Sequence, residues 1–288
     1  MHVIGLLFLS LSFSALATTT LTSRVHDIDH GSKPEDDTLV FLTNGQVVRF
    51  PTLEKALVDQ FAEAKEKKQW LEVTLDDNRT IVDARVTEAV EPEIKRSERN
   101  TDQKLREFKY VPTTLPNMDV AKELFREARY YSKDSQCFNR AMIWSYEWWK
   151  KRSVKSNKIL IFFTRNYIRR FDFEWWFHIA PAVHVLDENG KVVERVMDRK
   201  YSSAPRTHAE WSSIFMKGDY KHYKCPYITK YSEYANYPYT GECYFYRTNM
   251  YTYQPADLEM NEAWGYSKDK FNIAEVRAAY LEAFDEQH

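Results

Sequence analysis

The sequence is poor in the residues that several common functional motifs require. Glycine occurs only seven times among 288 residues, and no GxxxxGK[ST] phosphate-binding loop is present. The HExxH, CxxC and His-x-His spacings typical of metal sites are also missing. We therefore expect neither a metal ion nor another cofactor.

An excess of charge of one sign is lacking too. The chain has 41 Lys and Arg against 42 Asp and Glu, so no nucleic-acid footprint or polybasic membrane anchor is expected. The one long apolar run, Val3–Leu16, precedes the small-x-small pattern Ala15-Leu16-Ala17. Residues 1–17 thus have the pattern of a signal peptide, although Lys and Arg are missing from its start. We expect a secreted or periplasmic protein, soluble once processed; a retained anchor is the alternative.

Cysteine is scarce, with three residues in all. In an oxidising compartment Cys225 and Cys243 can form a disulfide bond, which leaves Cys137 alone. A lone thiol in an exported protein is either a reactive nucleophile or a buried, inert side chain.

The chain after the signal divides at a charged linker. Residues 18–37 are polar and predict a flexible entry, and 38–86 predict a hairpin, a helix starting at 51–52 and a second hairpin, a small ββαββ unit. Residues 88–107 are charged, poor in apolar residues and open to proteolysis. The order predicts a pro-domain with a cleavable linker over 18–107 and a catalytic domain over 108–288. A two-domain protein that stays whole is the alternative.

The second part predicts helices first and antiparallel strands afterwards, the order of an α+β fold. Helices are expected at 120–131 and 136–150, the second capped by Asp134 or Ser135, and at 208–217, capped by Thr207. The expected strands are 158–167, 175–186, 191–197 and 243–253, and 225–241 is an expected loop. Asn272 and Glu275 predict a capping box at the start of a C-terminal helix.

One Cys, one His and one Asp in this part have the order of a thiol triad. Cys137 lies in the first turn of its helix, where the helix dipole stabilises a thiolate. His178 lies in an apolar strand and Asp198 at the end of the next strand, where it could orient the imidazole. An odd number of unpaired residues in the 187–190 hairpin places His178 and Asp198 on one sheet face, and an even number separates them.

Each of these residues also has an ordinary structural role. A lone strand His is often a satisfied core residue, and a strand-terminal Asp is often a turn residue. His184, His208 and His222 are rival bases. Trp175 and Trp176 face opposite ways on a strand, so one of them could line a substrate cleft and the other the core.

Three motifs carry a resemblance to a known family. Ser135-Gln136-Cys137-Phe138-Asn139-Arg140-Ala141, Trp175-Trp176-Phe177-His178-Ile179-Ala180-Pro181 and Met197-Asp198 resemble the bacterial secreted protein-glutaminases, or protein-glutamine deamidases. The resemblance covers roughly residues 108–288. It implies a papain/transglutaminase-like core with helices on an antiparallel sheet, and an inhibitory pro-region.

The resemblance also implies site roles and a reaction. Cys137 would be the nucleophile, His178 the base and Asp198 its orienter, acting on protein-bound Gln through a thioester. The Cys137 backbone N–H would stabilise the oxyanion, and its partner donor stays open: Gln136 is adjacent and is a cleft candidate, whereas Tyr131 holds the position six residues before the nucleophile.

Other functions remain in competition. A papain-like cysteine protease or a transglutaminase would use the same triad, and an aromatic-rich extracellular binding module would leave Cys137 inert. The expected partners of a deamidase are protein substrates with accessible Gln and its own pro-domain, and we expect a monomer.

Overall fold

The computed structural model describes residues 18–33, 36–50, 55–88, 110–129, 135–265 and 267–284. The expected signal peptide, most of the expected linker, Tyr131 and Asp134 lie outside these ranges. The described residues fall into two compact units by their contacts, one within residues 18–43 and 48–88 and the other within residues 44–47 and 110–284. Among them, no helix has the length and apolar character that a membrane crossing needs.

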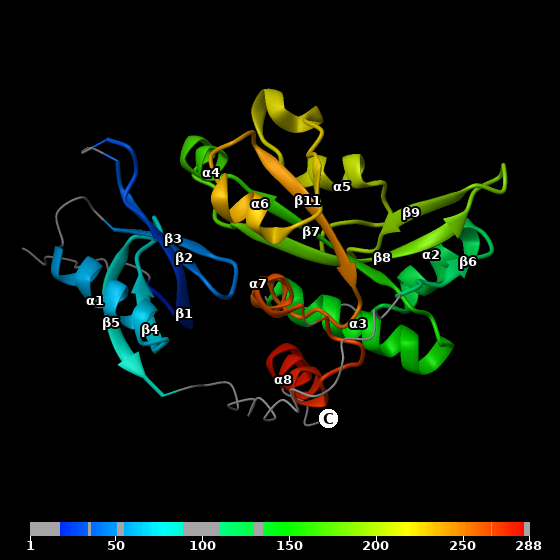
Figure 1. Ribbon diagram of the computed structural model, residues 1–288, viewed down its shortest axis with the longest axis horizontal. Helices are drawn as coiled ribbons and strands as arrows, with labels where there is room; N and C mark the ends of the chain where they lie inside the picture. Colours follow the sequence, from blue (N-terminus) through cyan, green and yellow to red (C-terminus); the bar gives the residue numbers. More distant parts are fainter. Residues whose placement is uncertain are drawn as a thin grey trace, which may run out of the picture. The chain divides into compact units, whose positions relative to one another are not determined.

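The smaller unit is a five-stranded antiparallel sheet with one helix (Figure 1). Its strand order is β3-β2-β1-β4-β5. The elements are β1 (Thr19–Asp29), β2 (Thr38–Leu42), β3 (Val47–Phe50), α1 (Lys55–Glu66), β4 (Trp70–Leu75) and β5 (Ile81–Thr87). Helix α1 buries Phe61 and Ala64 against a core of aliphatic side chains from the sheet.

The predicted flexible entry at residues 18–37 is wrong, because β1 is the central strand of this sheet. It pairs with β2 on one side and with β4 on the other. Thr, Val and Ile are frequent in this segment and favour extended backbone, and Ser23 and Val25 are buried on one face. The alternation is interrupted by a bulge between Val25 and Asp27, which hides the strand from a simple period-two pattern.

The larger unit is built on a six-stranded sheet whose long central strands are antiparallel. The order is β10-β11-β7-β8-β6, and β9 also pairs with β8. The strands are β6 (Thr114–Leu115), β7 (Asn157–Phe163), β8 (Phe177–Leu186), β9 (Val192–Val196), β10 (Tyr227–Ile228) and β11 (Cys243–Asn249). The short edge strands β6 and β10 are parallel to their neighbours. The predicted α+β class is confirmed.

Helices lie on both sides of this sheet (Figure 1). They are α2 (Met118–Glu127), α3 (Cys137–Arg152), α4 (Arg165–Phe171), α5 (His208–Phe215), α6 (Tyr231–Asn236), α7 (Pro255–Trp264) and α8 (Ile273–Phe284), with a 3₁₀ turn at Gly218–His222. Helix α3 packs along β8, and α8 packs on α3. Every residue of α3 from Cys137 to Trp148 is buried, which makes it the central helix of the unit.

Several predicted elements differ from those observed. The strand predicted at 158–167 ends at Phe163, because the Thr164 hydroxyl accepts the Tyr167 N–H and begins α4. Strand β11 ends at Asn249 rather than at 253. The predicted 225–241 loop contains β10 and α6, and α7, which starts at Pro255, was not predicted.

The caps differ in part from those predicted. Gln136, rather than Ser135, is the N-cap residue of α3, and its side chain makes no capping bond. Thr207 and Glu210 form the capping box of α5, as the Thr207 cap predicts. At α8, Asn272 Oδ1 accepts the Ala274 N–H, but the Glu275 carboxylate pairs with Lys268 instead of closing a box.

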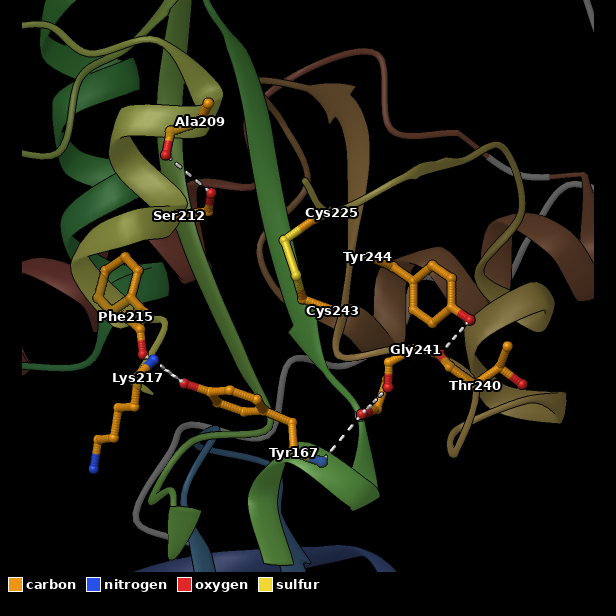
Figure 2. The surroundings of a disulfide bond; sticks show 11 residues. Tyr167, Ala209, Ser212, Phe215, Lys217, Cys225, Thr240, Gly241, Cys243 and Tyr244 are labelled. Carbon is orange, nitrogen blue, oxygen red and sulfur yellow. Dashed lines mark hydrogen bonds between the residues drawn. A yellow bond between two sulfur atoms is a disulfide. The ribbon is translucent and has the colours of Figure 1, made fainter. Parts of the chain in front are cut away.

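The disulfide bond predicted between Cys225 and Cys243 is present (Figure 2). It ties the segment that precedes β10 to the first residue of β11. Cys137 is the free cysteine and is buried. Nearby, the Tyr167 hydroxyl donates to the Phe215 carbonyl at 2.9 Å and accepts the Lys217 N–H at 2.8 Å, which anchors the end of α5.

Candidate active site

The register of the β8–β9 hairpin brings His178 and Asp198 onto one face of the sheet. Leu186 pairs with Val192, which leaves the odd number of residues between them unpaired. Ala182 pairs with Val196, so Asp198, just beyond β9, continues on the face of His178. Of the two arrangements that the sequence allowed, the one that joins the two residues is found.

The two side chains meet directly. His178 Nε2 lies 2.7 Å from Asp198 Oδ2, and both residues are buried. The Trp211 indole N–H of α5 donates to the same carboxylate oxygen at 2.9 Å. Two donors therefore fix the orientation of Asp198, and Asp198 in turn fixes the tautomer and orientation of the imidazole.

The nucleophile candidate also interacts with the imidazole. Cys137 is the first residue of α3, where backbone N–H groups lack partners within the helix. A hydrogen bond between its thiol and His178 is one of the influences on the imidazole. The three predicted residues are thus brought together.

The electrostatics of the site favour its charged forms. Burial lowers the pKa of His178, but the charge and hydrogen bond of Asp198 and the bond to Cys137 outweigh burial and raise that pKa to about 9. Burial raises the pKa of Asp198, but His178, Trp211 and the Arg140 charge outweigh burial and lower it. The arrangement therefore holds an imidazolium beside a carboxylate at neutral pH.

Aromatic rings enclose the imidazole. The ring centres of Phe215, Tyr201 and Trp211 lie 4.7, 5.2 and 5.6 Å from that of His178. Helix α5 supplies two of them, and its capping box and the Tyr167 anchor hold both of its ends. Tyr201 keeps 37% of its surface exposed, so the wall of the site that it forms is open to solvent.

The residues that enclose the His178 imidazole could not be predicted from the sequence. Trp211 and Phe215 lie on a short helix whose capping box is the only local signal, and no local signal shows which group the indole contacts. Arg140 stands in the nucleophile motif, but its burial follows only from the packing of α3.

The rival histidines lie elsewhere. His184 is six residues along β8 from His178, about 20 Å away at the rise of a strand. Its ring approaches Glu194 at 3.5 Å, and that of His208 approaches the same carboxylate at 3.1 Å. His222 is exposed on the 3₁₀ turn. His184 and His208 therefore surround a different carboxylate, and His178 is the histidine paired with Asp198.

The remaining cleft candidates have different environments. Trp176 is buried and its ring packs against Phe162 and Tyr234, whereas Trp175 is half-buried. The Gln136 side-chain oxygen is buried, and no described residue bonds to it. The Gln136 backbone N–H donates to Glu282 Oε1 at 3.3 Å.

Residues 44–47 belong by their contacts to the larger unit. Gln46 forms a β-bridge with Trp175, and the Trp176 N–H donates to the Gly45 carbonyl at 3.0 Å. Gly45 has φ +94°, and a Cβ there would lie 3.1 Å from the Phe177 ring. This turn therefore lies against the residues that immediately precede His178, and glycine permits the close approach.

Among the residues that the structure describes, no group of three or more His, Cys, Asp or Glu side chains is placed to hold a metal ion. The donors at the site are one thiol, one imidazole and one carboxylate, and the latter two bond to each other.

Residues 107–215 match the family model described as Glutaminase. The resemblance to the glutaminases is confirmed. The matched segment contains Cys137, His178 and Asp198. No curated protein sequence matches the chain significantly.

Solved structures share the fold. The crystal structure of pro-protein-glutaminase has a TM-score of 0.52 at 13% identity and covers 91% of this chain and 92% of its own. The A47Q2 mutant of pro-protein-glutaminase has a TM-score of 0.50 at 13% identity, with 82% and 84% covered. At this identity the likeness concerns the fold, and it extends over most of both chains.

Proposed function

We propose that the protein is a protein-glutamine deamidase, a hydrolase that converts protein-bound Gln to Glu and releases ammonia. The observation that carries the proposal is the His178–Asp198 hydrogen bond at 2.7 Å beside the buried Cys137 at the start of α3. The glutaminase match over the same residues supports glutamine as the substrate class.

The first half-reaction forms a thioester. The Cys137 thiolate attacks the side-chain carboxamide carbon of Gln, and N–H donors that include the Cys137 backbone N–H stabilise the oxyanion. As the tetrahedral intermediate collapses, the carbon–nitrogen bond breaks and His178 gives its proton to the leaving ammonia. Asp198, held by Trp211, stabilises the imidazolium throughout.

The second half-reaction consumes water. The now neutral His178 takes a proton from a water molecule, whose oxygen attacks the thioester carbonyl. The carbon–sulfur bond breaks, which releases Glu and restores the thiolate and imidazolium. Transfer of the acyl group to a Lys amine instead of water would make the protein a transglutaminase.

The test measures the products that form when the protein is incubated with a Gln-rich substrate protein. We expect free ammonia in amounts that match the new Glu residues found by mass spectrometry, with the chain length unchanged. Gln–Lys cross-links as the main product would assign a transglutaminase, and peptide fragments would assign a protease. A chain that yields none of these, with Cys137 resistant to alkylation by iodoacetamide, would be a binding module.

We further propose that residues 18–107 are an inhibitory pro-domain with a cleavable linker, and that the protein is exported as a zymogen. The likeness of fold to pro-protein-glutaminase, which extends over 91% of this chain, supports the proposal. Export agrees with the disulfide bond between Cys225 and Cys243, which forms in oxidising compartments.

Two measurements test the zymogen. Limited proteolysis within residues 89–107 is expected to raise the rate of ammonia release. Gly45→Val, which places a branched side chain against Phe177, is expected to raise the rate of the uncleaved chain, with Gly190→Val as a control in an open turn. Equal rates before and after cleavage would exclude the pro-domain without affecting the deamidase assignment.

A further inference from the structure

Arg140 is a buried cation that the mechanism above does not use. It is 2% exposed and lies on α3 three residues after Cys137, one helical turn along the same side. Arginine is seldom fully buried unless its charge has a partner. Its position next to the candidate nucleophile therefore requires an explanation.

The guanidinium holds the residues that lead into the nucleophile. Nη1 donates to the Ser135 carbonyl and lies 3.5 Å from the Ser135 hydroxyl. The guanidinium carbon also lies 5.9 Å from the centre of the Tyr201 ring, which faces His178. Arg140 thus connects Ser135, which precedes α3, with Tyr201, which lines the site.

Its charge reaches the triad. The Arg140 charge contributes to the lowered pKa of Asp198 and opposes the rise that burial causes in the pKa of Tyr201. A charge inside a buried site is screened far less than a charge at the surface. The positive charge of Arg140 therefore acts on the ionised groups near it.

The formal charges of the triad show which charge Arg140 compensates. In the reactive form, the thiolate of Cys137 and the carboxylate of Asp198 carry two negative charges and the imidazolium of His178 carries one positive charge. The triad alone is therefore a buried group with one net negative charge. Arg140 supplies a positive charge against this net negative charge, although the Glu282 carboxyl also lies within reach of the Arg140 charge; an uncompensated buried charge is strongly unfavourable.

We propose that Arg140 is a positioning residue that provides the counter-charge for the thiolate form of the triad and fixes the Ser135–Gln136 entry to the nucleophile. The proposal deepens the deamidase assignment, because it names a residue that the same triad needs. It differs from a purely structural role in one respect: it predicts that loss of the charge changes how much thiolate is present at a given pH.

The experiment measures thiolate directly in the full chain. Cys137 is the free cysteine, so the ultraviolet absorbance of its thiolate can be followed against pH with Cys137→Ser as the blank. In Arg140→Met, which removes the charge and keeps a long side chain, we expect about tenfold less thiolate near neutral pH, with the curves converging at high pH. Arg140→Lys keeps the charge and should retain most of the thiolate.

A second variant tests the charge without changing Arg140. Glu282 accepts hydrogen bonds from the Gln136 N–H and from Asn139 at the start of α3. Burial raises the pKa of Glu282, and the hydrogen bonds and the Arg140 charge oppose this rise, so its carboxylate is the nearby anion above that pKa. Glu282→Gln removes that negative charge and keeps an acceptor, and it should shift the thiolate curve in the direction opposite to Arg140→Met. This measurement stands even if Arg140→Met does not fold.

The outcomes separate the alternatives. A fall in kcat with little change in KM for Arg140→Met, largely recovered in Arg140→Lys, supports the proposal. Superimposable thiolate curves for wild type, Arg140→Met and Glu282→Gln would overturn it, whatever the activities. Because thiolate is measured without substrate, failure of the deamidase assignment would leave the result on Arg140 standing.

Discussion

The two units of the chain have interiors of opposite character. The core of the smaller unit is a cluster of aliphatic and aromatic side chains, among them Val40, Leu42, Phe50, Phe61 and Leu71. The interior of the larger unit contains ionisable groups: Arg140, Lys158, His178 and Asp198 are each at most 3% exposed. An apolar core stabilises a fold without needing specific partners, whereas a buried charge must be paired and bonded.

The difference indicates which of the two units contains the candidate catalytic groups. These buried ionisable groups have defined partners, such as Asp198 for His178 and the Thr252 carbonyl, at 2.5 Å, for Lys158. Groups with strongly shifted pKa values gather at functional sites, because catalysis needs protonation states that water does not favour. In the described part of the smaller unit, in contrast, the core is apolar, and Asp29 is the buried ionisable side chain.

The largest expected effect is the loss of the nucleophile. Cys137→Ala should lower the rate of ammonia release by about 10⁴-fold or more, because no thioester can form. The near-ultraviolet circular dichroism should stay unchanged, since a small buried side chain is replaced by another. Ser213→Ala on the outer side of α5 is the matched control, and activity in Cys137→Ala near that of this control would remove the triad.

A core substitution in the smaller unit should affect stability instead. Phe61 is fully buried, and its ring centre lies 4.9 Å from that of Phe50. Phe61→Ala should destabilise this unit by about 3–5 kcal/mol, through lost burial and the cavity left behind. Denaturant unfolding measures the change.

The same variant sharpens the comparison between the units. Once the linker has been cleaved, Phe61→Ala should leave the rate of ammonia release at the wild-type value. A lowered rate after cleavage would show that the smaller unit supports the site rather than obstructing it.

The pH dependence of stability should reveal the ion pair of the larger unit. The pKa of His178 is raised to about 9, so the stability that its protonation contributes is complete below about pH 6.5 and is lost as the pH rises through about 9. The lowered pKa of Asp198 gives stability that is present above its ordinary value near 3.8 and is lost as the pH falls.

Unfolding free energies should accordingly fall by roughly 2 kcal/mol between pH 7 and pH 10 in the wild type. His178→Gln should flatten that part of the curve, because the titrating group is gone. A curve for His178→Gln that parallels the wild type would show that the alkaline loss comes from other groups.

The smallest expected effect concerns Trp211. Trp211→Phe keeps an aromatic ring beside His178 but removes the N–H that bonds to Asp198. We expect about a tenfold loss in kcat, since a hydrogen bond to a charged group contributes about 1.5–3 kcal/mol, partly replaced by water. An unchanged rate in Trp211→Phe would mean that His178 alone orients Asp198.

The sequence by itself determined the parts of the site. A thiol at the start of a helix, an apolar strand with one His and a strand-terminal Asp are local patterns, and the α+β order and the disulfide partners also followed from local signals. Local pattern failed where tertiary contacts decide: β1 is a strand because β2 and β4 flank it, and α7 forms in a segment without strong periodicity.

Only the tertiary structure decided how the parts combine. The odd hairpin loop brings His178 and Asp198 to one face, since strand side chains alternate and a one-residue change in pairing would have separated them. Packing of α5 placed the Trp211 indole on Asp198, and packing of α3 buried Arg140 beside the nucleophile. Charge and burial depend on what surrounds a residue in space, and the order of residues along the chain does not specify that.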